Sequence, residues 1–128
     1  MKVAHTCYRV SDLERSLAFY TALGFTEAVR LPLHIPGGSA SFLQLPGDTE
    51  PRIELWYEPG TGPHSPGAGY YHVGVAVEDL DELLPRLASL GIEPLVEPFK
   101  PVPDVPTRLT FIADPDGYQV ELLEHYPY

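Results

Sequence analysis

Two histidines and two glutamates recur at equal spacing along the chain, and together they could bind a metal ion. His5 and His72 are 67 residues apart, and Glu54 and Glu121 are separated by the same 67 residues. Neutral imidazole and carboxylate groups are ligands of zinc and related divalent ions. Four such ligands leave one or two positions open for water or substrate oxygens, as in catalytic sites. The spacing therefore predicts a catalytic metal centre.

Each of these residues has a simpler interpretation when it is taken alone. A lone His on a strand is more often a core or surface residue than a ligand. A pair of matching Glu residues could also arise by chance. The joint match of both types, in phase with the same helix signals, favours the metal centre. His34, His64 and His125 have no counterpart at this spacing and are expected in loops or near the terminus.

The spacing belongs to a repeat that extends along the whole chain. Aligning residues 1–61 with 68–128 without a gap gives 11 identities in 61 positions. About five would be expected by chance. We therefore expect a single domain, residues 1–128, built of two copies of one supersecondary unit. Apolar character is kept at four further pairs of positions: Phe25/Ile92, Phe42/Leu109, Leu45/Ile112 and Ile53/Val120.

Each copy is expected to contain one helix that ends at a glycine suited to a left-handed cap. In the first copy Ser11 precedes Glu14 by three residues, which is the spacing of a capping box. In the second copy the helix is expected from about residue 79 to residue 90. Pro85 lies inside this segment and predicts a kink or a later start near Leu83.

Four strand-like segments surround each helix and predict a βαβββ order. Alternating apolar and polar residues before each helix indicate the first strand, and three apolar segments follow the helix. Because side chains alternate along a strand, Cys7 and Arg9 share a face with His5. Glu54, Trp56 and Glu58 likewise share one face. The expected strands are 2–10, 25–31, 40–45 and 52–58 in the first copy, and 70–77, 92–97, 108–113 and 118–124 in the second.

Composition and charge exclude several classes of function. The 128 residues carry a net charge of −10, which argues against binding to nucleic acid or to an anionic membrane surface. No apolar segment approaches the roughly 20 residues of a membrane span, and a cytoplasmic protein is expected. The single cysteine, Cys7, excludes an internal disulfide and a CxxC metal knuckle, so a metal must be held by His and carboxylates.

Four segments of the chain also carry a family resemblance. They are HTxxRVxDLERSLxFYxxLGF at the start, IEL in the middle, HVGVAVxD from residue 72 and DPDGYxVEL near the end. Together they resemble glyoxalase I (lactoylglutathione lyase), a branch of the vicinal oxygen chelate (VOC) superfamily. The resemblance implies an α+β fold of two βαβββ units in tandem, with mixed sheets that curve around a metal site.

The resemblance also implies the contents of the site. Its metal ligands would be His5, Glu54, His72 and Glu121, holding one divalent ion, with zinc or nickel expected first and cobalt or manganese as alternatives. The usual state in the family is a homodimer, in which His5 and Glu54 of one chain complete a site with His72 and Glu121 of the other. The two copies could also close on each other within one chain.

The activity implied by the resemblance is the isomerisation of the hemithioacetal of methylglyoxal and a thiol. Glu121 would move one proton between adjacent carbons through an ene-diolate, and Glu54 could serve the other face, or both could be ligands only. Arg9 matches an arginine that holds glutathione, but Glu58 stands where the family has an asparagine. The ion pair expected between them predicts weak use of glutathione. Cys7 would line the pocket or act as a small filler.

Two other functions are kept as alternatives. The first is another enzyme of the superfamily, such as a thiol transferase or an extradiol dioxygenase. The second is a non-catalytic small-molecule binder of the bleomycin-resistance type, which would lack the metal. A Glu at position 54 favours glyoxalase I, because many of the related enzymes lack the ligand at that position.

Overall fold

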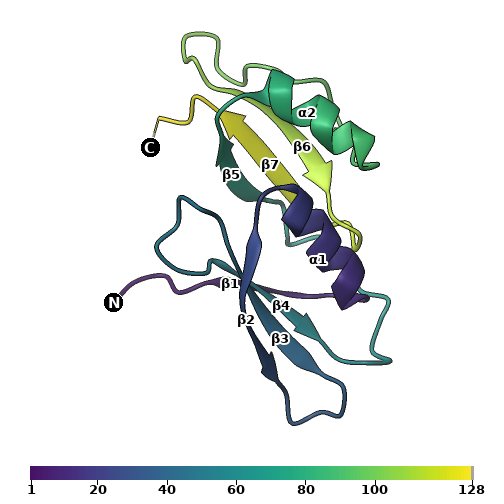
Figure 1. Cartoon of the computed structure of the whole chain (residues 1–128). Coiled ribbons are helices and arrows are strands. Elements are labelled where there is room, and N and C mark those ends of the chain that lie inside the picture. Colours follow the sequence, from purple (N-terminus) through teal and green to yellow (C-terminus); the bar gives the residue numbers. More distant parts are fainter. Residues whose placement is uncertain (128) are drawn as a thin grey trace. The chain divides into compact units, whose positions relative to one another are not determined.

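Two units of the chain, Met1–Ser65 and Pro66–Tyr128, each combine one helix with one mixed sheet (Figure 1). The computed structural model describes residues 1–127. The chain is α+β, as the sequence predicted. Unit 1 contains β1 (Thr6–Arg9), α1 (Leu13–Ala22), β2 (Thr26–Pro32), β3 (Ser39–Gln44) and β4 (Ile53–Tyr57), and unit 2 contains β5 (Val73–Val77), α2 (Leu80–Ser89), β6 (Arg108–Ala113) and β7 (Gln119–Glu124).

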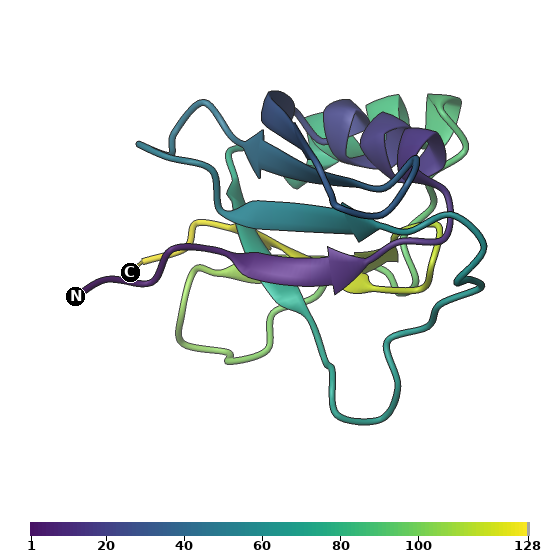
Figure 2. The same ribbon diagram turned by 90° about the horizontal axis from the view of Figure 1, so that it is seen from below.

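The sheet of unit 1 has the strand order β1-β4-β3-β2, with β1 parallel to β4 and the other pairs antiparallel (Figure 2). Side-chain alternation divides β4 between two faces. Ile53 and Leu55 are fully buried in the core of the unit. The helix α1 contributes Phe19 and Tyr20 to the core of the same unit. Glu54 points to the opposite face, so one strand serves both the core and the candidate site.

The sheet of unit 2 has three strands in the order β5-β7-β6, with β5 parallel to β7. The strand expected over residues 92–97 is not formed. In that region Leu95 donates its N–H to the carbonyl of Phe111, and Phe99 forms an isolated bridge with Leu109. Pro94 and the prolines beyond it have no N–H group, so a regular ladder cannot continue through this segment.

The first helix begins one residue later than the capping box predicted. Its N-cap is Asp12, whose carboxylate accepts a hydrogen bond from the Arg15 N–H at 3.0 Å. The Ser11 hydroxyl instead accepts a hydrogen bond from the His64 N–H at 2.7 Å. Asp and Ser are comparable N-cap residues. A long-range contact that the local pattern does not contain therefore decides between them. The left-handed glycine is confirmed, because Gly24 has φ of +106°.

The second helix contains its proline rather than beginning near it. Asp79 caps α2 and accepts a hydrogen bond from the Glu82 N–H, so the later start near Leu83 is wrong. Pro85 lies in the sixth helical position and is exposed. Its ring cannot donate to the carbonyl of Asp81, which removes one intrahelical hydrogen bond.

The two units are offset differently in their last two strands. Phe42 lies opposite Glu54, and Phe111 lies opposite Glu121. Phe42 and Phe111 are therefore equivalent, at a separation of 69 residues. The connection before the last strand is shorter by two residues in unit 2. A shift of two leaves every side chain on its original face, so the apolar pattern could not reveal it. Two of the predicted pairs, Phe42/Leu109 and Leu45/Ile112, are wrong by two residues for this reason.

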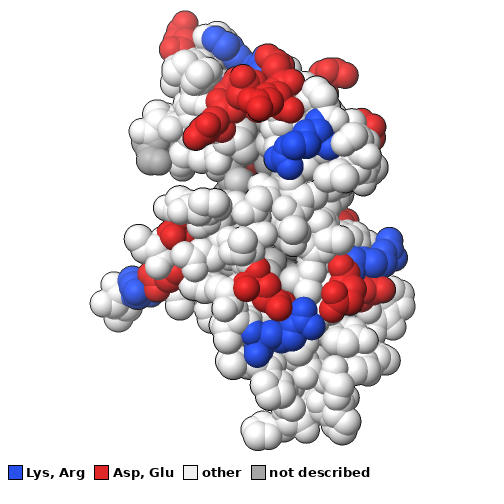
Figure 3. Space-filling model, viewed as in Figure 1, with Lys and Arg blue, Asp and Glu red and all other residues white. Residues whose placement is uncertain are grey.

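Acidic side chains gather over the beginning of α2 (Figure 3). Asp81 and Glu82 lie in the first turn of this helix, where negative charge interacts favourably with the helix dipole. In the part of the chain that the structure describes, no helix is long and apolar enough to span a membrane. The cytoplasmic location expected from the sequence stays a prediction.

Candidate metal centre

The structure brings His5 and Glu54 together in unit 1, and we refer to this pair as the first half-site. The Nε2 atom of His5 lies 2.7 Å from Oε2 of Glu54. Glu54 comes from β4, which is parallel to β1, and its direct neighbour across the two strands is Cys7. Only 9% of Glu54 is exposed. A carboxylate this buried requires a partner, and His5 supplies one.

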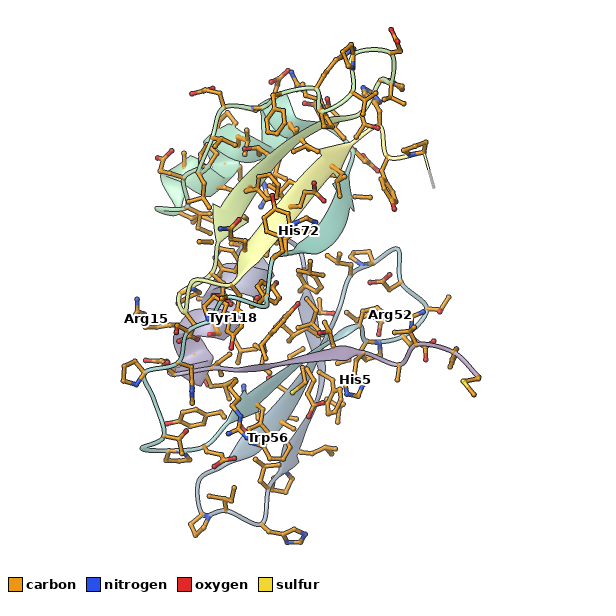
Figure 4. All side chains as sticks on the ribbon, turned by 180° about the vertical axis from the view of Figure 1, so that it is seen from behind. His5, Arg15, Arg52, Trp56, His72 and Tyr118 are labelled. Carbon is orange, nitrogen blue, oxygen red and sulfur yellow. The ribbon has the colours of Figure 1, made fainter. Side chains whose placement is uncertain are left out.

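Arg52 fastens the segment that carries His5. Its guanidinium donates to the carbonyl of Val3 at 2.7 Å and to that of Ala4 at 3.4 Å. The Arg52 carbonyl in turn accepts from the Thr6 N–H at 3.0 Å. Figure 4 shows His5 and Arg52 on neighbouring segments of unit 1. His5 precedes β1 by one residue, so these bonds fix its position. The sequence analysis missed this role, because nothing in the local pattern links Arg52 to the N-terminal segment.

The second half-site, His72 and Glu121, repeats this arrangement in unit 2. The Nε2 atom of His72 lies 3.2 Å from Oε2 of Glu121. His72 directly precedes β5 (Figure 4), and β5 runs parallel to β7, which carries Glu121. The residue opposite Glu121 is Gly74. Glycine has no side chain that could donate to the carboxylate, whereas Cys7 holds the equivalent position in the first half-site.

An aromatic ring contacts the imidazole in each half-site, and the sequence analysis missed these rings. His5 and Phe42 meet edge to face, with centroids 5.3 Å apart, and His72 lies 5.5 Å from Phe111. Tyr71 lies against His72 as well, at 4.5 Å. The signal that could have found both phenylalanines is the strand register, because each lies opposite a candidate glutamate ligand.

The predicted substrate-binding residues Arg9 and Glu58 also meet. The distance from Nη1 of Arg9 to Oε1 of Glu58 is 3.6 Å, and the Trp56 indole N–H donates to the same oxygen at 2.6 Å. Arg9 lies directly opposite Trp56 in the pairing of β1 with β4. The Glu58 carboxylate therefore accepts an indole hydrogen bond and partly balances the charge of Arg9.

Cys7 is a neutral thiol in this environment. Partial desolvation raises the pKa of the Cys7 thiol to about 11, and the neighbouring Glu54 carboxylate contributes in the same direction. The thiol donates a hydrogen bond to Glu54. The side chain is nevertheless exposed on its unit, so it is not the buried filler that was one of the two sequence-based interpretations.

The donor atoms of both half-sites fit a divalent ion. Zinc binds His nitrogen and carboxylate oxygen at about 2.0–2.2 Å, so two ligand atoms on one ion are roughly 2.9–3.5 Å apart. The 3.2 Å of the second half-site lies in this range, and the 2.7 Å of the first is a hydrogen-bond distance that an ion would lengthen. Within residues 1–127, no three His, Cys, Asp or Glu side chains assemble in a way that could hold an ion.

A cavity of about 770 Å³ lies elsewhere in unit 1, at the beginning of α1 and beside the β2–β3 connection. None of the predicted site residues lines it. Tyr57 and Ser39 form part of its wall, and they are paired with each other across β4 and β3. Their side chains point to the face opposite that of Glu54, because residues 54 and 57 are separated by an odd number of positions. The cavity and the first half-site are therefore on different faces of the sheet.

Comparison with known proteins decides the family. Residues 2–122 match the profile of the Glyoxalase/Bleomycin resistance protein/Dioxygenase superfamily. The chain belongs to this superfamily. Within it, the lactoylglutathione lyase of Salmonella typhimurium is 34% identical over 97% of this chain and 93% of that protein. A probable chloroplastic lactoylglutathione lyase of Arabidopsis thaliana is 36% identical over 98% of this chain. The chain spans only 36% of that plant protein's length.

Solved structures of the same superfamily agree. Glyoxalase I from Zea mays superposes with a TM-score of 0.83 at 31% identity, over 96% of this chain and 44% of that one. The trypanothione-dependent glyoxalase I of Leishmania major has a TM-score of 0.79 at 28% identity, over 98% of this chain and 87% of that one. The protein is a glyoxalase-I-like member of the superfamily, as the sequence motifs predicted.

Proposed function

We propose that this chain catalyses the glyoxalase I reaction, the isomerisation of a methylglyoxal–thiol hemithioacetal to a lactoyl thioester. The observation that carries the proposal is the pairing of His5 with Glu54 at 2.7 Å and of His72 with Glu121 at 3.2 Å. Each unit presents one imidazole and one carboxylate from equivalent positions. The relatives named lactoylglutathione lyase support the same activity.

We further propose that the two half-sites complete one metal centre, because each supplies only two ligands. The centre would form either within one chain or between two chains of a homodimer. Zinc and nickel are the first candidates, followed by cobalt and manganese, since all accept imidazole and carboxylate ligands. When bound, the ion would stabilise negative charge that develops on two adjacent substrate oxygens.

Glu121 is assigned to the proton transfer. Its carboxylate accepts the proton from the carbon that bears sulfur and returns it to the adjacent carbon, so the reaction has no net redox change. A base must be able to move between these two positions. Gly74 supports this assignment, because it leaves space beside Glu121: a Cβ at position 74 would lie 3.6 Å from Oε2 of that carboxylate.

Glu54 is assigned mainly to ligation, with a possible part at the opposite face of the substrate. It is held by His5 and by the Cys7 thiol. These two contacts restrain its carboxylate more than His72 alone restrains that of Glu121. The difference between the two half-sites therefore favours Glu121 as the mobile base.

Arg9 and Glu58 are proposed to contact the thiol part of the substrate. The 3.6 Å contact between them reduces the positive charge that Arg9 offers to the carboxylates of glutathione. A thiol with less negative charge would be accepted more readily. The Leishmania major relative is trypanothione-dependent, so the thiol differs among proteins of this kind.

Metal analysis together with an assay tests the proposed function. The purified full chain, loaded in turn with zinc, nickel, cobalt and manganese, is incubated with methylglyoxal and glutathione, trypanothione or cysteine. Formation of the thioester is followed by absorbance. We expect turnover with at least one metal and thiol, and none in Glu121→Gln. Absence of turnover with every combination would overturn the proposal, and tight metal binding without turnover would favour another enzyme of the superfamily.

A further inference from the structure

Two aromatic side chains surround the imidazole of His72. The ring centroids of Tyr71 and Phe111 lie 4.5 Å and 5.5 Å from that of His72, at interplanar angles of 51° and 54°. The two aromatic rings also lie 6.1 Å from each other. All three residues belong to unit 2, so the contacts depend on that unit alone. We refer to Tyr71 and Phe111 as the aromatic clamp.

The second nitrogen of His72 is not held by a hydrogen bond. Its Nδ1 atom is buried, and within residues 1–127 it has no hydrogen-bond partner. A histidine that binds a metal almost always donates its other ring N–H to a carbonyl or carboxylate, which fixes the ring orientation. His72 lacks that support although its Nε2 faces Glu121 at 3.2 Å. Something else must therefore hold the ring in place.

We propose that Tyr71 and Phe111 are positioning residues that orient the His72 imidazole toward Glu121 by ring contact instead of a hydrogen bond. Offset and tilted aromatic pairs at these distances are favourable beyond simple burial. Tyr71 is 69% exposed, so it is not needed for the core of the unit. The equivalent position in unit 1 is Ala4, and His5 contacts Phe42.

The orientation of the ring is tested first in the metal-free full chain. NMR relaxation of ¹³C-labelled histidine reports the order of the His72 ring in wild type, Tyr71→Ala and Tyr71→Phe. Tyr126→Ala removes another exposed tyrosine of unit 2 and serves as the matched control. We expect lower order at His72 in Tyr71→Ala only, with His5 unchanged. Equal order in wild type and Tyr71→Ala would overturn the proposal.

The consequence for the metal is tested by cobalt titration of the same proteins, and this part rests on the proposed function. Loss of a residue that supports a metal ligand typically weakens affinity about 10-fold or more. We expect that change and an altered cobalt absorption spectrum in Tyr71→Ala, with affinity within about twofold of wild type in Tyr71→Phe. Phe111→Leu, which keeps an apolar side chain, should act in the same direction as Tyr71→Ala.

The outcomes separate the two proposals. If wild type binds no cobalt, zinc or nickel, the proposed metal centre is wrong, whereas the relaxation data still decide whether the clamp orients His72. If Tyr71→Ala binds cobalt with unchanged affinity and spectrum, the clamp has no role at the metal even though the metal centre stands. Equal melting temperatures in Tyr71→Ala and Tyr126→Ala would show that unfolding does not cause the effect.

Discussion

Unit 1 and unit 2 build the same pair of residues from sheets of different size. In both, a His directly precedes a strand that is parallel to the strand carrying the Glu. Unit 1 adds two antiparallel strands, whereas unit 2 adds one and continues with an irregular, proline-containing segment. The parallel pair and the adjacent Phe-bearing strand are therefore sufficient to place the half-site, and the outer strand is dispensable for it.

The units fasten the segment before the His in opposite directions. In unit 1 the Arg52 side chain donates to the carbonyl of Val3. In unit 2 the Tyr70 hydroxyl donates to the carbonyl of Gln119 at 2.9 Å. Residues 70 and 119 are equivalent to 3 and 52 at the separation of 67. The same two positions are tied together, with donor and acceptor exchanged, so the tie itself matters more than the residue that makes it.

Unit 2 contains a buried ionic group that unit 1 lacks. Glu124 is 7% exposed and accepts from the Leu80 N–H at 2.8 Å and from Arg108 Nε at 3.0 Å. These bonds connect the beginning of α2 with β6 and β7. The equivalent residue in unit 1 is Tyr57, which is uncharged. With only three strands, unit 2 is stabilised in part by this buried carboxylate.

Removing either imidazole should have the largest effect. We expect His5→Ala and His72→Ala each to lose most of the bound divalent ion while the fold is retained, because neither side chain belongs to a buried core. Elemental analysis measures the metal, and circular dichroism monitors the fold. His34→Ala changes a histidine outside both half-sites and is the control. Full metal content in both variants would remove the ligand assignment.

Mixing two inactive variants tests whether the half-sites combine between chains. Glu54→Gln and Glu121→Gln should each be inactive alone. In a heterodimer, one site would contain both glutamates and the other neither. After subunit exchange we expect about a quarter of wild-type activity, because about half of the dimers are mixed and each has one intact site. No recovery after verified exchange would show that the site forms within one chain.

Glu124→Ala should destabilise the protein by about 3 kcal/mol, since removing one partner of a buried ion pair leaves the other charge uncompensated. Urea unfolding measures the change. Glu14→Ala is the matched control: it removes an exposed carboxylate that pairs with Arg30 at 3.4 Å. Exposed pairs contribute about 0–1 kcal/mol. Equal losses in the two variants would contradict the special role of the buried carboxylate in unit 2.

Glu58→Asn should lower KM for the glutathione hemithioacetal about tenfold, which is about 1.4 kcal/mol. The value of kcat should change little, because proton transfer does not involve this end of the substrate. Added salt should narrow the difference, since charges are screened over about 10 Å at 0.1 M. Steady-state kinetics provide the measurement, and equal KM values would show that Glu58 does not oppose glutathione.

The smallest expected effect concerns the two helices. Pro85→Ala restores an N–H group within α2 and should stabilise the protein by about 1 kcal/mol, the gain in helix stability exceeding the loss of proline's restraint on the unfolded chain. Thermal unfolding measures it. Ala18→Pro, in the sixth position of α1, should have the opposite sign. A destabilised Pro85→Ala would mean that the proline ring itself makes a needed contact.

The sequence by itself determined the features that depend on local period and on repetition. Alternation placed Glu54, Trp56 and Glu58 on one face, and the repeat paired His5 with His72 and Glu54 with Glu121. These patterns survive because strand geometry has a period of two and because both units use the same strand order. The pairing of Arg9 with Glu58 followed from the same alternation and is present in the structure.

Only the tertiary structure decided which residues meet across strands and loops. The offset of two in β6 is invisible to an alternating pattern, so the equivalence of Phe42 and Phe111 required the strand register. The absence of a strand over residues 92–97 depends on prolines that remove ladder donors. The choice of Asp12 over Ser11 depends on a hydrogen bond from His64, 53 residues away. Such contacts join distant parts of the chain, and local sequence does not encode them.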